Sequence, residues 1–355
     1  MYPPFINKIT TFVKDKQIIM KNTLKFILFA MLLTSATSSF GGNKPRKGFL
    51  YREGTQLMLD GKKYQSVSFN SAQLSGCGHD YEVFPDEEID NLFKMLPKGI
   101  LIRTWAFPGN EERIKQLIDR AEKYGHKLSL TLGDGRSGCG HHDGAKNGDG
   151  TGKKPEWYTE GYKKEYLPHV RHIVKRFKDS PAVGMWEIIN EPGDASWQDI
   201  KKFYDTIATE IKQIDANHLV SSGSWAPWAY NGLEPFQEMH TSPYIDVGCI
   251  HEYDYDYNQS NTIESPHFAV ALKAMQSLNK VLIVEETGIE SGKNCRTDYE
   301  TRAKAMKEKI NIYLQKGSCA VLIWNLARKV KGCALNFTPS DPLMSIILHH
   351  PANQH

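Results

Sequence analysis

The 355-residue chain lacks several features, and each absence narrows what it can be. No apolar run approaches the roughly 20 residues that a membrane-spanning helix needs; the run at 26–33 has eight. The net charge is only +3, which gives no reason to expect nucleic acid or an anionic membrane surface as a partner. No C-x-x-C pair occurs, which argues against a zinc ribbon or a thioredoxin-like redox site.

Linkers and nucleotide motifs are also missing. No Pro/Ser-rich or low-complexity segment divides the chain after residue 38, so we expect a single domain over 39–355. No Gly-rich dinucleotide turn follows the first apolar run, which disfavours a doubly wound open sheet. The segment GDGTGKK is not a phosphate loop, because Asn147 replaces its first glycine and Lys154 its Ser/Thr.

The first 38 residues have the layout of a secretory signal. Lys21 and Lys25 precede the apolar run 26–33, and Ala36 and Ser38 are placed for cleavage after Ser38. We therefore predict secretion to the extracellular space or periplasm, with no membrane attachment after cleavage. Either Met1 or Met20 can be the start.

The mature chain alternates short apolar runs with amphipathic segments. Runs of strand length occur at 64–70, 99–107, 127–135, 182–192, 218–225, 244–253, 281–288 and 319–325. Helical spacing of apolar residues fills intervening segments such as 111–125, 196–214 and 298–317. Eight such units predict a (β/α)8 TIM barrel, whose chemistry sits at the carboxyl ends of the strands.

Two carboxylates stand at such strand ends. Glu191 closes the fourth run, and Glu286 closes the seventh, nearly opposite it around the ring. Glycosidic bond cleavage needs two carboxyl groups, one to protonate the leaving oxygen and one to act as nucleophile or base. The alternative is a structural ion pair at the strand ends.

The motifs WEIINEP, VEETG, IRTW and HEY resemble those of the retaining (β/α)8 glycoside hydrolases, most closely family 5 and its endo-β-1,4-mannanase-like members. The resemblance implies that Glu191 is the acid/base and Glu286 the nucleophile. It also implies a surrounding set: Asn190 on the sugar 2-hydroxyl, Arg103 and Tyr253 beside the nucleophile, His251 lining the site, and Trp324 as the floor under the sugar.

Elementary chemistry supports these roles. A cation at Arg103 would lower the pKa of one glutamate and not the other, which separates nucleophile from acid. Family members often have an aromatic residue where this chain has Thr287, and Glu285 lies next to the chosen nucleophile. Strand alternation should send Glu285 and Glu286 to opposite faces, and Glu286 fits E-x-G.

Loops at the same end of the barrel supply further candidates. Aromatic rings there can hold successive sugars of a polymer: Trp105, Trp157, Trp225, Trp228 and Tyr255. The long loop 133–154 contains His141-His142-Asp143, which we interpret as solvated rather than metal-binding.

The six cysteines are compatible with an oxidising compartment. We expect Cys77–Cys139 and Cys295–Cys333 bridges between top-face loops, and buried free thiols at Cys249 and Cys319.

The sequence thus predicts a secreted, monomeric, retaining endo-β-1,4-glycoside hydrolase with a polysaccharide substrate, mannan or glucomannan preferred, and with no metal or cofactor. Three alternatives stay open: a β-1,4-glucanase, a transglycosylase with the same residues, and a non-catalytic glycan-binding barrel. Double displacement further predicts carboxyl groups about 5 to 5.5 Å apart, against about 6.5 to 9.5 Å in inverting enzymes.

Overall fold

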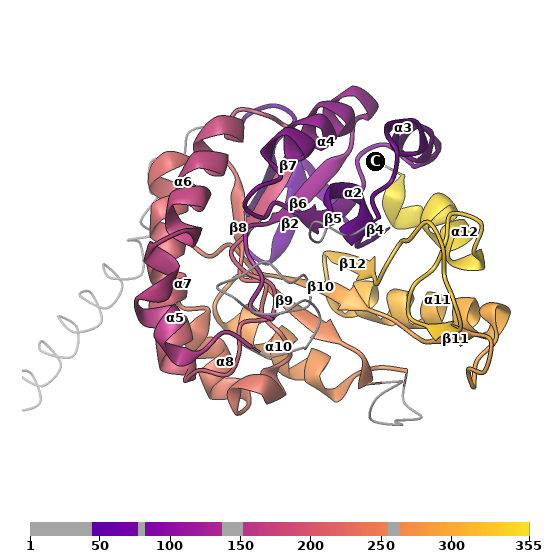
Figure 1. Cartoon of the computed structure of the whole chain (residues 1–355). Helices are drawn as coiled ribbons and strands as arrows, with labels where there is room; N and C mark the ends of the chain where they lie inside the picture. The colour runs from indigo at the N-terminus through magenta and orange to yellow at the C-terminus, as the bar shows by residue number, and fades with distance from the viewer. Residues whose placement is uncertain (1–44, 77–81, 137–151, 255–262, 355) are drawn as a thin grey trace, which may run out of the picture. The chain divides into compact units, whose positions relative to one another are not determined.

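Eight parallel strands form the centre of the computed structural model, which describes residues 45–76, 82–136, 152–254 and 263–354 (Figure 1). Within these residues the strands are β4 (Ser66–Phe69), β5 (Leu101–Trp105), β6 (Lys127–Thr131), β7 (Val183–Glu187), β8 (Leu219–Ser221), β9 (Val247–Glu252), β10 (Val281–Thr287) and β12 (Ala320–Ile323). Their order is β4-β12-β10-β9-β8-β7-β6-β5, and a parallel bridge between Asn70 and Arg103 joins the two ends. The predicted (β/α)8 barrel is confirmed.

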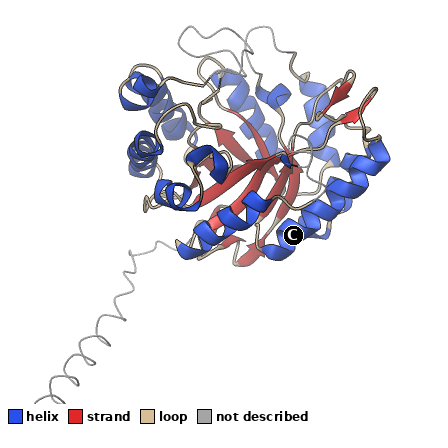
Figure 2. Cartoon of the chain, turned by 90° about the horizontal axis from the view of Figure 1, so that it is seen from below, coloured by secondary structure: helices blue, strands red, loops and turns tan. Residues whose placement is uncertain are grey.

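Helices surround the strands, as Figure 2 shows. They are α2 (Ala72–Ser75), α3 (Asp86–Met95), α4 (Glu111–Tyr124), α5 (Pro155–Thr159), α6 (Tyr166–Phe177), α7 (Trp197–Ile214), α8 (Leu233–Met239), α10 (Pro266–Ser277), α11 (Tyr299–Lys316) and α12 (Pro342–His349), with short 3-10 turns at Gly161–Lys163, Pro227–Tyr230 and Pro351–Asn353. The three helices predicted by periodicity are confirmed as α4, α7 and α11. Ser196 caps α7 by accepting a hydrogen bond from the Asp199 amide, and the left-handed Gly125 ends α4.

A three-stranded antiparallel sheet precedes the barrel. It consists of β1 (Leu50–Glu53), β2 (Gln56–Leu59) and β3 (Lys62–Tyr64). Its buried face packs in one apolar cluster with residues that begin barrel strands, including Leu101, Leu219 and Val281. The sheet therefore closes the end of the barrel at which the strands start, and the opposite end carries the loops.

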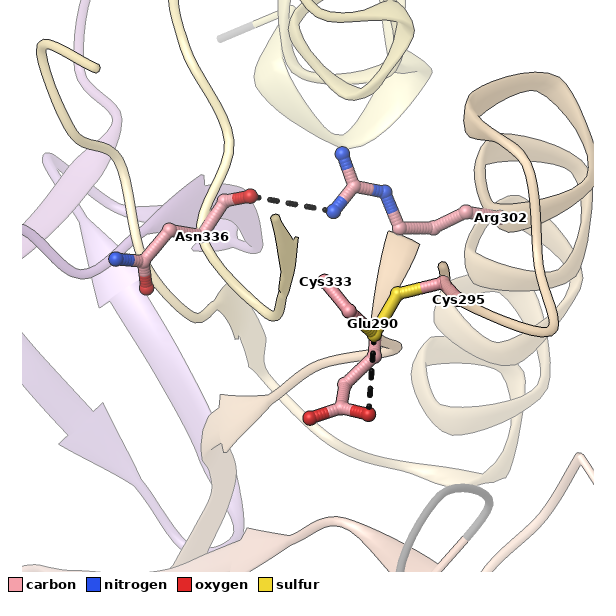
Figure 3. The surroundings of a disulfide bond; sticks show 5 residues. All are labelled: Glu290, Cys295, Arg302, Cys333 and Asn336. Atoms are coloured by element: carbon pink, nitrogen blue, oxygen red, sulfur yellow. Dashed lines mark hydrogen bonds between the residues drawn. A yellow bond between two sulfur atoms is a disulfide. The ribbon is translucent and has the colours of Figure 1, made fainter. Parts of the chain in front are cut away.

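Between the strands and the helices lies a larger core of fully buried aliphatic and aromatic side chains. Figure 3 shows one tie between the loops that follow β10 and β12. The short strands β11 (Ser291–Gly292) and β13 (Cys333–Ala334) pair there, and Cys295 and Cys333 form a disulfide. The predicted Cys295–Cys333 pairing is confirmed, as are the buried free thiols of Cys249 and Cys319.

Several predictions concern segments outside the described residues. These are the signal segment with its cleavage site after Ser38, the Cys77–Cys139 bridge, His141-His142-Asp143 in the loop 133–154, and Tyr255. In the part of the chain that is described, none of the helices has the length and apolarity needed to cross a bilayer.

Candidate active site

Arg103 is the centre of the site at the carboxyl ends of the strands. Its side chain is fully buried on β5 and donates five hydrogen bonds. Two go to the carboxylate of Glu187, at 2.6 and 2.7 Å, and one goes to Glu286. The others reach the side-chain oxygens of Asn70 (2.9 Å) and Asn190 (2.8 Å). Because a guanidinium has five N–H donors, this geometry uses all of them and fixes the orientation of Arg103.

Glu187 was missed by the sequence analysis. It is the last residue of β7 and is fully buried, with a further hydrogen bond of 2.6 Å from the Thr131 hydroxyl. Burial raises its pKa to about 7, although the Arg103 cation opposes the shift. The signal was present in the sequence, since Glu187 is the first carboxylate in the apolar run that ends at Glu191.

Glu286 and Tyr253 meet at the mouth of the barrel. The Tyr253 hydroxyl donates to Glu286 Oε2 at 2.7 Å, and Arg103 donates to Oε1 of the same carboxylate. Burial raises the pKa of Glu286, while the His251 and Arg103 cations lower it. The net direction is upward, which differs from the expectation that Arg103 would set a low pKa, because the carboxylate is almost completely removed from water.

His251 links the two predicted catalytic glutamates. Its Nδ1 lies 2.9 Å from Glu191 Oε1 and 3.4 Å from Glu286 Oε1. One oxygen of each carboxylate and a ring nitrogen of His251 all lie within 4.8 Å of one another. Although burial opposes protonation, the surrounding carboxylates raise the pKa of His251 well above its usual range. The ring therefore lies between two carboxyl groups that favour its protonated form.

A break in strand register places Glu285 in the same interior. The pairing of β10 with β9 shifts between Val284 and Glu286, and this shift marks a β-bulge. Glu285 Oε2 lies 3.5 Å from His251 Nε2, and its Oε1 lies 3.9 Å from Arg103 Nε. The prediction that alternation sends Glu285 and Glu286 to opposite faces is wrong, because the bulge interrupts the two-residue period.

Glu191 lies beyond the end of its strand. The fourth run was predicted as strand over 182–192, but β7 ends at Glu187, and Glu191 has a left-handed backbone with φ of 43°. Its amide donates to Gly223 O at 2.9 Å. A Cβ at Gly223, where φ is 68°, would lie 1.9 Å from Ile189 O, so only glycine allows this close approach. Strained backbone of this kind is typical of functional sites.

Asn190 is held in one amide orientation. Its Oδ1 accepts from Arg103, and its Nδ2 donates to Asp134 Oδ1 at 2.9 Å. Asp134 follows β6 and forms a backbone bridge with Asn190. Residues at the carboxyl ends of β5, β6 and β7 thus meet at the Asn190 side chain.

Trp324 follows β12, and its ring is partly buried. The ring centroid lies 6.0 Å from that of Trp105, and the Trp324–Asn325 peptide is cis. Trp105 is only 3% exposed and stacks on Phe107 at 5.3 Å. The structure therefore places Trp105 behind Trp324, with almost none of its own ring at the surface.

The remaining aromatic residues divide into two groups. Trp157 is partly buried and packs against the aromatic rings of Tyr158, Tyr162, Tyr166 and Phe203. It also lines a pocket with Gly133 and Asp134 after β6, and its expected place in a substrate cleft stays a prediction.

Trp225 and Trp228 form a second pair, with ring centroids 4.8 Å apart. Trp228 is 50% exposed, and the Arg136 guanidinium lies 4.9 Å from the Trp225 ring. This pair therefore offers exposed aromatic surface.

Three groups of residue types that can bind a metal occur within the described residues. The sulfurs of Cys295 and Cys333, near Glu290, are bonded to each other. The other two groups both depend on His251. Both ring nitrogens of His251 face carboxylates, Nδ1 toward Glu191 and Glu286 and Nε2 toward Glu285.

The chain is similar in sequence to known glycoside hydrolases. The family described as "Cellulase (glycosyl hydrolase family 5)" matches residues 110–329. A probable mannan endo-1,4-beta-mannosidase F of Aspergillus oryzae is 26% identical over 328 residues, covering 79% of this chain and 67% of that protein. Mannan endo-1,4-beta-mannosidase 3 of Arabidopsis thaliana is 26% identical over 283 residues, covering 64% and 67%.

Solved structures show the same fold. The endo-1,4-beta-mannanase from Rhizomucor miehei superposes with a TM-score of 0.66 at 20% identity, over 85% of this chain and 98% of that one. An endo-beta-1,4-mannanase from Thermotoga petrophila gives 0.64 at 18% identity, over 82% and 77%. The match of the family over well over half of the chain confirms the resemblance read from the motifs: the chain belongs to glycoside hydrolase family 5.

Proposed function

We propose that the chain is a secreted, retaining endo-β-1,4-mannanase. The observation that carries the proposal is the pair of carboxylates bridged by His251, with one oxygen of each within 4.8 Å. That proximity suits double displacement, for which carboxyl groups stand about 5 to 5.5 Å apart, better than inversion, which needs room for a water between them. Mannan is preferred because relatives over most of the chain are named mannan endo-1,4-beta-mannosidases.

In the first step Glu286 attacks the anomeric carbon of the sugar. Glu191 donates its proton to the glycosidic oxygen, and the C–O bond breaks to leave a glycosyl ester on Glu286. Arg103 and Tyr253 each donate a hydrogen bond to the attacking carboxylate and fix its orientation toward the sugar. In the second step Glu191, now a carboxylate, takes a proton from water, and the water oxygen replaces Glu286 on the sugar.

The neighbouring residues bind and orient the substrate. The amide of Asn190, fixed by Arg103 and Asp134, faces the 2-hydroxyl, and Trp324 supports the apolar face of the ring. Trp225 and Trp228 follow Gly223, whose carbonyl oxygen accepts a hydrogen bond from the Glu191 amide, and we expect these rings to bind further sugars of the polymer. No cofactor takes part in this chemistry.

Three experiments test the proposal. First, reducing-sugar release by residues 39–355 on β-mannan, glucomannan, carboxymethyl cellulose and xylan gives the substrate; mannan should be cut fastest. The family description names cellulases, so faster cleavage of carboxymethyl cellulose would make the chain a β-1,4-glucanase.

Second, azide rescue separates the two glutamates. Glu191→Ala with azide and a dinitrophenyl β-glycoside should give the β-glycosyl azide, because azide attacks the covalent intermediate. Glu286→Ala should give the α-azide, because azide then replaces the nucleophile.

Binding of mannan without any cleavage by the wild type would support a non-catalytic barrel, and chain-lengthened products would support a transglycosylase.

Third, N-terminal sequencing of protein recovered from outside cells that express the full chain tests secretion. A new terminus at residue 39 is expected. Retention of the intact N-terminus inside the cell would exclude the proposed cleavage after Ser38.

A further inference from the structure

A buried polar cluster lies on the helix-facing side of β9 and β10. It consists of Glu252, Thr287 and Lys309, whose side chains are fully shielded from solvent. Lys309 Nζ lies 2.7 Å from Glu252 Oε1, and the Thr287 hydroxyl donates to the same oxygen at 2.5 Å. Lys309 Nζ also lies 3.3 Å from Thr287 Oγ1. We call these three residues the outer cluster.

The outer cluster stands back to back with the active site. In the parallel pairing of β9 and β10, His251 is opposite Glu286 and Glu252 is opposite Thr287. His251 and Glu286 point into the barrel, where they contact each other. The next residue on each strand points outward to Lys309 on α11.

The outer cluster also lies on the far side of the bulge. The regular pairing of β10 with β9 ends at Val284 and resumes at Glu286. The pairing of the residues before the bulge therefore does not determine which residue of β9 lies opposite Glu286. Something must fix the shifted register. Directly after the shift, the bond between Thr287 and Glu252 links the side chains of the two strands on the outer face of the barrel, where His251 and Glu286 are linked on the inner face.

Stability alone does not account for this cluster. Removing an ammonium and a carboxylate from water is energetically costly, and apolar residues of the same volume often give equal or greater stability. The same helix has a second buried pair near its start, Arg302 with Asp341, which joins α11 to the beginning of α12. Figure 3 shows the hydrogen bond that Arg302 donates to the Asn336 carbonyl oxygen, beside the disulfide.

We propose that Lys309, Glu252 and Thr287 are positioning residues that lock β9 and β10 in the shifted register and so hold Glu286 against Tyr253 and Arg103. The proposal rests on the proposed role of Glu286 as the nucleophile. The lock acts through the backbone of two adjacent residue pairs, and none of its three side chains contacts the substrate. Loss of the lock lets Glu286 move relative to its partners while the apolar core keeps the barrel folded.

The test compares charge-free variants with a matched control. Glu252→Gln/Lys309→Met removes both charges together, so no buried ion is left unpaired. Thr287→Val removes only the hydroxyl, and Thr287→Ser keeps it. Arg302→Met/Asp341→Asn is the control, because it removes a buried pair from the same helix at a distance from β9 and β10.

Two readouts separate positioning from general stability. Melting temperature reports the fold, and kcat and KM are measured with 2,4-dinitrophenyl β-mannobioside, whose leaving group needs no protonation. We expect kcat to fall about 10- to 100-fold in the double variant and in Thr287→Val, the scale set by a misplacement of about 1 Å, with KM little changed. Thr287→Ser should regain most of the activity, and the control should keep full kcat even if it melts earlier.

The opposite pattern would overturn the proposal. If the double variant and Thr287→Val keep wild-type kcat, or lose it only in proportion to the control, the outer cluster is merely structural. Glu286→Ala, measured alongside, separates this result from failure of the proposed function. An inactive Glu286→Ala with an active double variant removes the positioning role and leaves the nucleophile assignment intact.

Discussion

The guanidinium of Arg103 forms a bidentate ion pair with Glu187, through Nε and one terminal nitrogen, at 2.6 and 2.7 Å. Both side chains are completely buried. The other terminal nitrogen, Nη1, donates to Glu286. Glu187 therefore orients Arg103 so that it contacts Glu286.

This pair predicts a strong effect of Glu187→Gln. The amide removes the bidentate carboxylate from the buried guanidinium, which keeps only Glu286 and the more distant Glu285, and breaking a buried ion pair costs about 3 to 5 kcal/mol. We expect a loss of unfolding free energy near the lower end of that range, because the amide keeps some hydrogen bonds, together with at least a 10-fold loss of kcat/KM. Denaturant unfolding and steady-state kinetics measure the two effects.

The control for that experiment is Glu210→Gln. Glu210 also accepts two hydrogen bonds from one arginine, Arg171, at 2.7 and 2.8 Å, but this arginine is about half exposed. Exposed pairs contribute under about 1 kcal/mol, so both stability and activity should stay near wild type. Equal effects of the two substitutions would contradict the role of Arg103–Glu187.

Tyr253→Phe should reduce turnover without unfolding the protein. It removes one hydrogen bond to the Glu286 carboxylate, and a hydrogen bond to a charged group contributes about 1.5 to 3 kcal/mol. At about 1.4 kcal/mol per factor of ten, kcat should fall about 10- to 100-fold. Tyr64→Phe is the matched control, since it removes a buried hydroxyl that donates to Gly99 O at 2.6 Å. That control should lower the melting temperature but leave kcat unchanged.

Asp215 predicts a specific loss of stability in acid. Although burial opposes it, hydrogen bonds from His218 (2.5 Å) and Trp186 (2.8 Å) lower the pKa of Asp215 to about 2. The carboxylate therefore stabilises the fold above its unfolded pKa of about 3.9 and loses this contribution, about 2 kcal/mol, as the pH falls toward 2.

Unfolding curves of the wild type and Asp215→Asn between pH 5 and pH 2 check this sign. The difference between them should be largest at pH 5 and shrink toward pH 2, whereas Asp179→Asn, at an exposed position, should follow the wild type throughout. A difference that grows in acid would show that the pKa of Asp215 is not lowered.

Reduction of the Cys295–Cys333 bridge should destabilise the loops after β10 and β12. The bridge closes a loop with a sequence separation of 38, for which the chain-entropy model gives about 4 kcal/mol. We expect Cys295→Ser/Cys333→Ser to melt several degrees lower than the wild type. Cys319→Ser alters a free buried thiol and serves as the control. A reductant should change its melting temperature by the same amount as that of the wild type. An unchanged melting temperature of the double variant would exclude a stabilising bridge.

Substitution of Trp228 should raise the KM for a polymer more than the KM for a small substrate. Half of its surface is exposed beside Trp225, and aromatic stacking contributes about 0.5 to 1.5 kcal/mol. Trp228→Ala should therefore raise KM on soluble mannan several-fold and leave kinetics on a short aryl glycoside unchanged. Trp228→Phe keeps a ring and should lie between. A parallel loss on both substrates would mean that the residue acts on the fold and not on the polymer.

The apolar runs predicted all eight barrel strands because a parallel strand covered on both faces reads as continuous hydrophobic sequence. Strand order around the barrel then brought Arg103, His251 and Glu286 together without further information. Two features could not be predicted in this way. The carboxylate of Glu187 is visible in the sequence, but the length of its apolar run gives no sign that the strand stops there, and the bulge at Glu285 leaves no mark in a two-residue period.

The three-stranded sheet β1–β3 has a practical consequence for handling the enzyme. Near its start, Gly48 O accepts from Lys127 at the beginning of β6, and Phe49 packs on His218 at the beginning of β8, with ring centroids 4.7 Å apart. The chain therefore enters the barrel at its sealed end, opposite the catalytic mouth. A support or fusion partner coupled just ahead of Arg46 would leave the mouth turned toward free solution, where a long, insoluble chain can still reach it.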